Sequence, residues 1–144
     1  MEQLTFSKLE LNKPFYLGDI ILSEQEIMDY AQAFDPLEFH TNKEAAAKSH
    51  FKGLVASGSH VFTLIHRTKW IPVFGKTVLA GLEVNNWKFL KPIYPNQKIT
   101  STVTITAIKP NTEKHYATVT WFYEFKNEQQ ELLQVLEMIV LHKQ

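Results

Sequence analysis

The alternation of apolar and polar side chains from Thr77 to the C-terminal end constrains the fold most strongly. In its clearest part, every second residue from Thr100 to Thr106 is a threonine, and the opposite face is predicted to be apolar, with Ile99, Val103, Ile105 and Ala107. A period of two predicts β-strands with one buried face. Turn residues interrupt the pattern and leave four predicted strands, Lys76–Leu90, Lys98–Ile108, Lys114–Lys126 and Leu132–His142.

Two longer helices and one more strand are predicted before this region. A short strand is expected near Pro14–Leu17. The first helix follows Ser23, which forms a capping box with Glu26 and precedes apolar residues spaced three and four apart. The second runs from His60 to Trp70 and is expected to end at Pro72. Its apolar stripe consists of Val61, Leu64, Ile65 and Thr68.

These elements predict the α+β class, with one long antiparallel sheet around a mostly buried helix. The strand Leu132–His142 is apolar on both faces, so one face needs a cover that the helix cannot supply. A second copy of the chain is the simplest cover. The pattern therefore predicts a homodimer.

Composition narrows the possible functions. The 144 residues are expected to form one domain, 1–144, and the hydrophobic fraction of 44% is that of a globular protein. Fifteen basic and 15 acidic side chains give no net charge, which argues against nucleic acid or an anionic membrane as a partner. The chain has no cysteine, which excludes disulfides and thiolate zinc sites. No signal peptide is expected in Met1–Gly18 and no membrane span anywhere, so the expected location is the cytoplasm.

Asp35 and His40 are the candidate reactive pair. Pro36 disfavours a helical conformation at Asp35, so the first helix should stop there and both side chains should lie on a turn. A capping box from Thr41 to Glu44 then predicts a short helix, Lys43–Lys48. Gly58 follows in an apolar loop that leads into the longest helix. Backbone amides at a helix start can stabilise a developing negative charge.

The segment from Ala33 to Gly58 resembles the MaoC-like dehydratases, the R-specific enoyl-CoA hydratase branch of the hotdog superfamily. In that family a histidine follows an aspartate by five positions and a glycine follows the histidine by eighteen, as Asp35, His40 and Gly58 do. The usual string is Gly-Asp-x-Asn-Pro-x-His, and Leu37 stands where that string has asparagine. The chain is closer to a subgroup with Phe-Asp-Pro-x-x-Phe-His followed by Ala-Ser-Gly-x-His, the second of which is Ala56–His60 here.

The resemblance implies a hotdog fold and hydration of a 2-enoyl thioester. His40 would be the base that takes a proton from water, Asp35 would hold the water and relay a proton, and the amide of Gly58 would stabilise the oxyanion. Ser57 and His60 are further substrate-binding candidates, although the first is as easily a helix cap and the second a structural residue. The substrate would be an acyl-CoA or acyl carrier protein thioester, with no cofactor and no metal.

Several alternatives stay open from the sequence. Glu38 is a second carboxylate that could face His40 instead of Asp35. Thioester hydrolysis and acyl-CoA binding without catalysis are alternative functions on the same fold. The apolar segment Trp70–Phe74 is expected to be a loop that lines an acyl tunnel or covers the dimer seam. His50, His115 and His142 are expected at the surface. Lys88 and Lys91 flank Trp87 and Phe89, and they are either solvated lysines at a strand edge or a site for the phosphates or adenine of coenzyme A.

Overall fold

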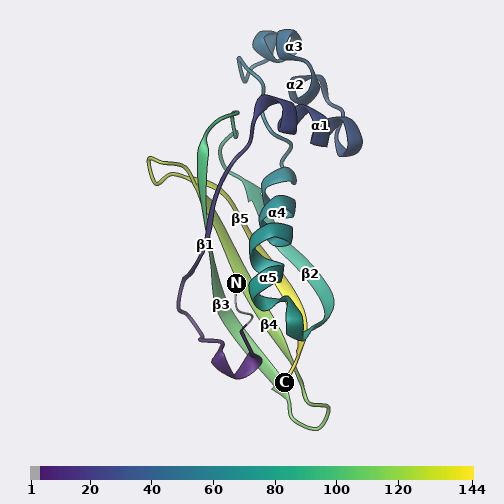
Figure 1. The fold of residues 1–144 in the computed structure, drawn as a ribbon, viewed down its shortest axis with the longest axis vertical. Helices are drawn as coiled ribbons and strands as arrows, with labels where there is room; N and C mark the ends of the chain where they lie inside the picture. Colours follow the sequence, from purple (N-terminus) through teal and green to yellow (C-terminus); the bar gives the residue numbers. More distant parts are fainter. Residues whose placement is uncertain (1–3) are drawn as a thin grey trace.

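The computed structural model describes residues 4–144, in which five strands form one antiparallel sheet in the order β1-β3-β4-β5-β2 (Figure 1). Residues 1–3 lie outside the described residues. They are the start of Met1–Gly18, the segment in which no signal peptide is expected. The four long strands confirm the predicted ones to within three residues at each end, and the predicted short strand extends to Ile21. The strands are β1 Phe15–Ile21, β2 Val78–Phe89, β3 Lys98–Asn111, β4 Tyr116–Lys126 and β5 Leu132–Lys143.

The inner face of the sheet carries the core. Alternate residues of β4, from Ala117 to Phe125, are buried, as their period of two predicts. On β3 the pairing with β4 shifts between Ile105 and Ala107, which pair with Trp121 and Thr120. This β-bulge exchanges the two faces of the strand. The prediction that the buried face continues to Ala107 is therefore wrong, and Ile108 packs against the core instead.

One helical run from His60 to Phe74 lies along the inner face of the sheet (Figure 1). It consists of α4 His60–Ile65, the π-helical segment η2 His66–Trp70 and α5 Ile71–Phe74. The predicted end at Pro72 is wrong. The amide of Ile71 donates to the carbonyl of His66, five residues back, so Pro72 falls in the first turn of α5, where its missing N–H costs little.

The π-helical segment also shifts the buried stripe. Val61 and Ile65 are buried as predicted, but Thr68 is exposed because the inserted residue turns it away from the sheet. Trp70 and Phe74 take the buried positions beyond the π-turn, with 1% and 3% of their surface exposed. The prediction that Trp70–Phe74 forms a loop is therefore wrong.

Three helices project beyond one end of the sheet (Figure 1) and are called the overhang below: α1 Glu24–Phe34, α2 Glu38–Thr41 and α3 Lys43–Lys48. The predicted capping box of α1 is present, with the amide of Glu26 donating to Ser23 Oγ. The bounds of α3 are confirmed, but its N-cap is Asn42, whose Oδ1 accepts from an amide at 3.0 Å. Thr41 does not cap α3, because its hydroxyl donates to the carbonyl of Leu37 inside α2.

A buried histidine lies at the opposite end of the sheet. His142 has no exposed surface, and its ring lies between Trp121 and Thr77. The indole N–H of Trp121 donates to His142 Nε2 at 3.0 Å, and Nδ1 is 2.9 Å from the Thr77 hydroxyl. Burial lowers the pKa of His142 to about 4. The prediction that His142 is a surface residue is therefore wrong.

The remaining short elements are two 3-10 turns near this end, η1 Phe6–Lys8 and η3 Gly75–Thr77. Between residues 4 and 144, no helix is both long enough and apolar enough to cross a membrane.

Candidate active site

The structure brings Asp35 and His40 together in the overhang. Asp35 is the C-cap of α1, where its amide still donates to the carbonyl of Ala31 at 2.8 Å before Pro36 ends the helix. His40 lies in the single turn of α2, so the prediction that both residues lie on a turn is wrong for His40. His40 Nε2 is 3.3 Å from Asp35 Oδ2. Glu38 makes no such contact with a described residue, so Asp35 is the carboxylate that faces the imidazole.

The hydrogen bond on the other ring nitrogen determines what His40 can do. His40 Nδ1 is 2.7 Å from the carbonyl oxygen of Val55. Because a carbonyl only accepts, Nδ1 must carry the proton, and the neutral ring then has its lone pair on Nε2. The His40 side chain is 7% exposed, whereas that of Asp35 is 36% exposed. Nε2 therefore faces a carboxylate that solvent and ligands can reach, and the two atoms hydrogen-bond directly only when one of them carries a proton.

Hydrogen bonds attach the Gly58 segment to the overhang and to the sheet. The amide of Val55 donates to the carbonyl of Phe39, the neighbour of His40, at 3.2 Å. On the sheet side, the buried Gln134 of β5 donates to the carbonyl of Gly58 at 2.8 Å and accepts from the indole of Trp87. The amide of Gly58 donates to no described residue. It is thus a free donor at the start of a fifteen-residue helical run.

Phe89 of β2 packs against Gly58. A Cβ at Gly58 would lie 2.7 to 2.9 Å from three ring atoms of Phe89, which is too close for any real side chain. Glycine allows the Phe89 ring to approach this closely, and a larger side chain at position 58 would require the ring to shift. The Phe89 side chain is itself 59% exposed, so its ring can move when a ligand arrives at Gly58.

Two buried polar atoms beside Gly58 have no hydrogen-bond partner within residues 4–144: Ser57 Oγ and His60 Nδ1. Burial lowers the pKa of His60, which keeps the ring neutral near pH 7. Unsatisfied buried polar groups are uncommon in folded proteins, and they gather at functional sites. Ser57 and His60 thus lie beside Gly58 as the sequence predicted, while any contact with a substrate stays a prediction.

Tyr30 is a contact that the sequence did not reveal. Its ring stacks on His60 with centroids 4.1 Å apart, and its hydroxyl is 2.7 Å from Ser59 Oγ. Tyr30 thereby joins α1, which carries Asp35, to the start of α4. In the sequence Tyr30 has no signal beyond the apolar stripe of a helix. Gln134 had one, since it is one of the few polar residues in a largely apolar strand.

No group of three or more His, Cys, Asp or Glu side chains in the described part of the chain is arranged to hold a metal ion. His60 does not join Asp35 and His40 in such a group.

Comparisons with known proteins define the class. The structure is similar to the MaoC-like dehydratase from Rhodospirillum rubrum, with a TM-score of 0.85 and 26% identity over 98% of this chain and 97% of that one. It is also similar to the (R)-hydratase from A. caviae involved in PHA biosynthesis, with a TM-score of 0.75 and 18% identity over 92% and 96% of the chains. The protein thus has the α+β hotdog fold that the sequence predicted.

The family follows from the sequence itself. A family model described as "MaoC like domain" matches residues 7–122. The chain is also 28% identical to the uncharacterized protein YdeM of Bacillus subtilis strain 168. The match extends over 109 residues, which are 74% of this chain and 77% of that protein. The chain belongs to the MaoC-like domain family.

Proposed function

We propose that the protein is an (R)-specific enoyl-CoA hydratase, or equally the dehydratase that runs the same reaction backwards. The observation that carries the proposal is the arrangement of His40, whose Nδ1 donates to the carbonyl of Val55 while Nε2 lies 3.3 Å from Asp35 Oδ2. A neutral imidazole with one free nitrogen is suited to take a proton from water near neutral pH.

The reaction follows from these positions. His40 Nε2 takes a proton from a water molecule as its oxygen adds to C3 of the 2-enoyl thioester. The electrons of the double bond move towards the thioester oxygen, where the free amide of Gly58 stabilises the negative charge. Asp35 holds the same water and passes the proton that His40 Nε2 has taken on to C2, which completes the 3-hydroxyacyl thioester and returns both side chains to their starting states. Acid–base catalysis contributes roughly 10²- to 10⁴-fold, and one oxyanion donor roughly 10²- to 10³-fold.

The substrate we propose is an acyl thioester of coenzyme A or acyl carrier protein. Its carbonyl would lie at Gly58, next to the unsatisfied Ser57 hydroxyl and His60 Nδ1. The mobile Phe89 ring would move aside to admit the acyl group. A place in fatty acid metabolism and a location in the cytoplasm stay predictions.

A homodimer is part of the proposal. Strand β2 is an edge of the sheet, and several of its apolar side chains are about half exposed. Exposed apolar edges of this length favour pairing with another chain. The same edge ends at Phe89, so the partner would lie beside the Gly58 segment. The exposed apolar residues are Leu79, Leu82, Val84, Phe89 and Leu90.

Leu37 is the feature that favours a second candidate, a module that binds acyl-CoA without catalysis. Leu37 is the N-cap of α2, where it makes no side-chain capping bond, and it is 50% exposed. The usual family asparagine at this position could hydrogen-bond a substrate, which leucine cannot do. Tight binding of acyl-CoA without turnover would favour this candidate.

The experiment follows the loss of the conjugated enoyl-thioester absorbance with crotonyl-CoA and longer 2-enoyl-CoAs. Wild type should turn over to the R-3-hydroxyacyl product, whereas Asp35→Asn and His40→Ala should be inactive while keeping the wild-type circular dichroism. Glu38→Gln is the matched control, since it removes a nearby carboxylate that does not face His40. Activity retained in Asp35→Asn or His40→Ala would refute the proposed roles. Release of free thiol from saturated butyryl-CoA would indicate thioester hydrolysis instead.

A further inference from the structure

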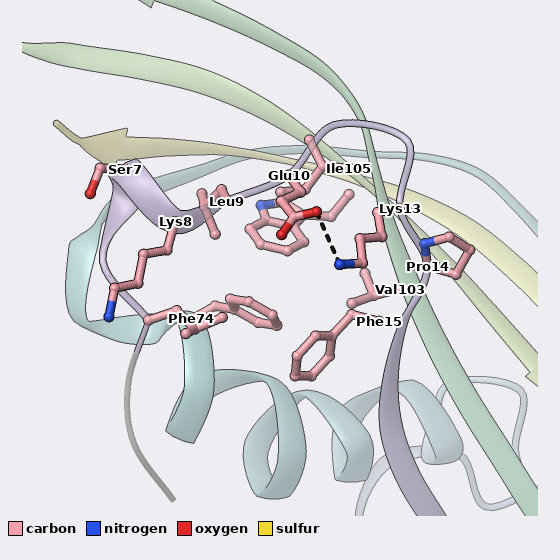
Figure 2. Close-up of a pocket in the computed structure, with 12 residues that line it drawn as sticks. Ser7, Lys8, Leu9, Glu10, Lys13, Pro14, Phe15, Phe74, Val103 and Ile105 are labelled. Atoms are coloured by element: carbon pink, nitrogen blue, oxygen red, sulfur yellow. Dashed lines mark ion pairs between the residues drawn. The ribbon is translucent and has the colours of Figure 1, made fainter.

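A second cavity lies far from the candidate active site, at the end of the sheet where the chain begins. It has a volume of about 520 Å³ and lies between the N-terminal segment, β1, β3 and the end of the helical run (Figure 2). This volume falls within the range of roughly 300–1,000 Å³ that is usual for small-molecule sites. It is called the N-terminal pocket below.

The N-terminal pocket is separate from the Asp35–His40–Gly58 site. Phe74, which lines the pocket, ends the fifteen-residue helical run that starts just after Gly58. At about 1.5 Å per residue, the run spans roughly 20 Å. The pocket also lies on the β1–β3 side of the sheet, whereas Gly58 contacts β5 and β2 on the other side. A ligand in one site would not touch the other.

The walls of the pocket are apolar and aromatic. Phe15 and Phe74 pack edge to face with centroids 5.1 Å apart (Figure 2), and the Phe15 side chain is left 37% exposed. Val103, Ile105 and Trp121 of the sheet complete the wall and are almost wholly buried. Covering the exposed part of such a wall with an apolar ligand is favourable, by roughly 25 cal/mol per Å² of apolar surface.

The rim carries more positive than negative charge. Lys13 Nζ is 3.1 Å from Glu10 Oε2 across the pocket (Figure 2). Lys8 lies on the other side of the pocket in the same view and forms no ion pair with a described residue. Two lysines against one glutamate leave a net positive rim above an apolar cavity. The arrangement is complementary to a molecule with an apolar body and one anionic end.

We propose that the N-terminal pocket binds a medium-chain fatty acid, with its alkyl chain against Phe15, Phe74 and Ile105 and its carboxylate at the positively charged rim. The site does not depend on the hydratase chemistry of Asp35 and His40. It gives the protein a second place to bind a fatty acyl group, one that takes a free carboxylate.

The test is calorimetric titration of the full chain with three probes of equal chain length: decanoate, decanol and decyltrimethylammonium. Decanoate should bind with a stoichiometry of one per chain and more tightly than the other two. The double variant Lys8→Gln/Lys13→Gln should weaken decanoate binding by about tenfold and leave decanol binding unchanged. Lys126→Gln is the control. It should have no effect, because Lys126 is the last residue of β4 and does not line the pocket.

Amide chemical shifts of the labelled protein locate the bound probe. Decanoate should shift the amides of Phe15, Val103, Ile105 and Trp121 and leave those of His40 and Gly58 in place. Shifts confined to His40 and Gly58 would overturn the proposal, since decanoate would then occupy the candidate active site. Equal binding of all three probes would overturn the proposed role of the lysines, and no binding of decanoate would overturn the site as a whole.

Discussion

His40 and His142 are both buried histidines, at opposite ends of the molecule, and their surroundings differ in one respect. Both ring nitrogens of His142 are occupied, by the indole N–H of Trp121 and the hydroxyl of Thr77. His40 uses only Nδ1, and its Nε2 points to Asp35, which is 36% exposed. Burial alone therefore does not mark a reactive histidine. What matters is whether a nitrogen remains free and whether a substrate can reach it.

The largest expected effect is a difference in turnover between variants of the two histidines. His40→Gln keeps an amide that can donate to Val55 but loses the basic nitrogen, so hydration of crotonyl-CoA should fall roughly 10²- to 10⁴-fold. His142→Leu should change turnover by less than about threefold at temperatures where it is folded, because His142 lies outside the site. A large loss of turnover in His142→Leu, with normal activity in His40→Gln, would reverse the comparison.

The second effect separates them by stability. His142→Leu leaves the buried indole N–H of Trp121 without an acceptor, which should lower the free energy of unfolding by about 2–3 kcal/mol in urea denaturation. His50→Leu, at an exposed position, should change it by no more than about 0.5 kcal/mol. Adding Trp121→Phe to His142→Leu should cost less than the sum of the two single changes, since both partners of the bond are then absent.

The third effect is the pH dependence of stability. The unfolded chain protonates His142 near pH 6.5, but the folded chain protonates it only near pH 4, so between these values the unfolded state binds more protons. Stability should therefore fall as the pH is lowered through this window, by about 2 kcal/mol between pH 7 and pH 5. Urea denaturation at each pH measures the slope. His142→Leu should show a shallower slope, although burial also lowers the pKa of His60 and His66.

The smallest expected effect concerns how the overhang is held. Tyr30→Phe keeps the ring stack on His60 and loses the hydroxyl contacts to Ser59 and Thr63, so it should lower the free energy of unfolding by about 1 kcal/mol. Turnover should fall only a few-fold, since Asp35 and His40 remain. Tyr116→Phe is the control, because its hydroxyl makes no hydrogen bond to a described residue. An unchanged Tyr30→Phe protein would mean that this contact does not hold α1 to α4.

Local patterns predicted the elements whose determinants lie close together in the chain. The capping box at Ser23, the bounds of α3 and the four long strands all follow from residues within one turn or one period of each other. The pairing of Asp35 with His40 was predicted for the same reason, with the resemblance to a family supplying the roles. Those roles stay predictions until activity is measured.

Features that depend on distant residues could not be predicted. His142 is buried because Trp121 and Thr77, 21 and 65 positions away, reach its two nitrogens, and nothing near the end of the chain indicates this. The contact of Tyr30 with His60 and that of Gln134 with Gly58 are equally non-local. The prediction that the helix ends at Pro72 failed for a different reason, because a π-turn cannot be recognised from an apolar stripe.

The π-turn at His66–Trp70 also has a consequence for how the two ends of the molecule can change. Buried positions in an α-helix recur about every four residues, and the π-turn takes up one extra residue, so the buried positions step by five from Ile65 to Trp70 and by four on either side. Gly58 and His60 precede the insertion, while Trp70 and Phe74 follow it. Deleting Arg67, one exposed residue of the π-turn, should therefore restore a step of four and a regular α-helix with both the Gly58 end and the aromatic end still against the sheet, whereas deleting a second residue should turn the two ends out of phase.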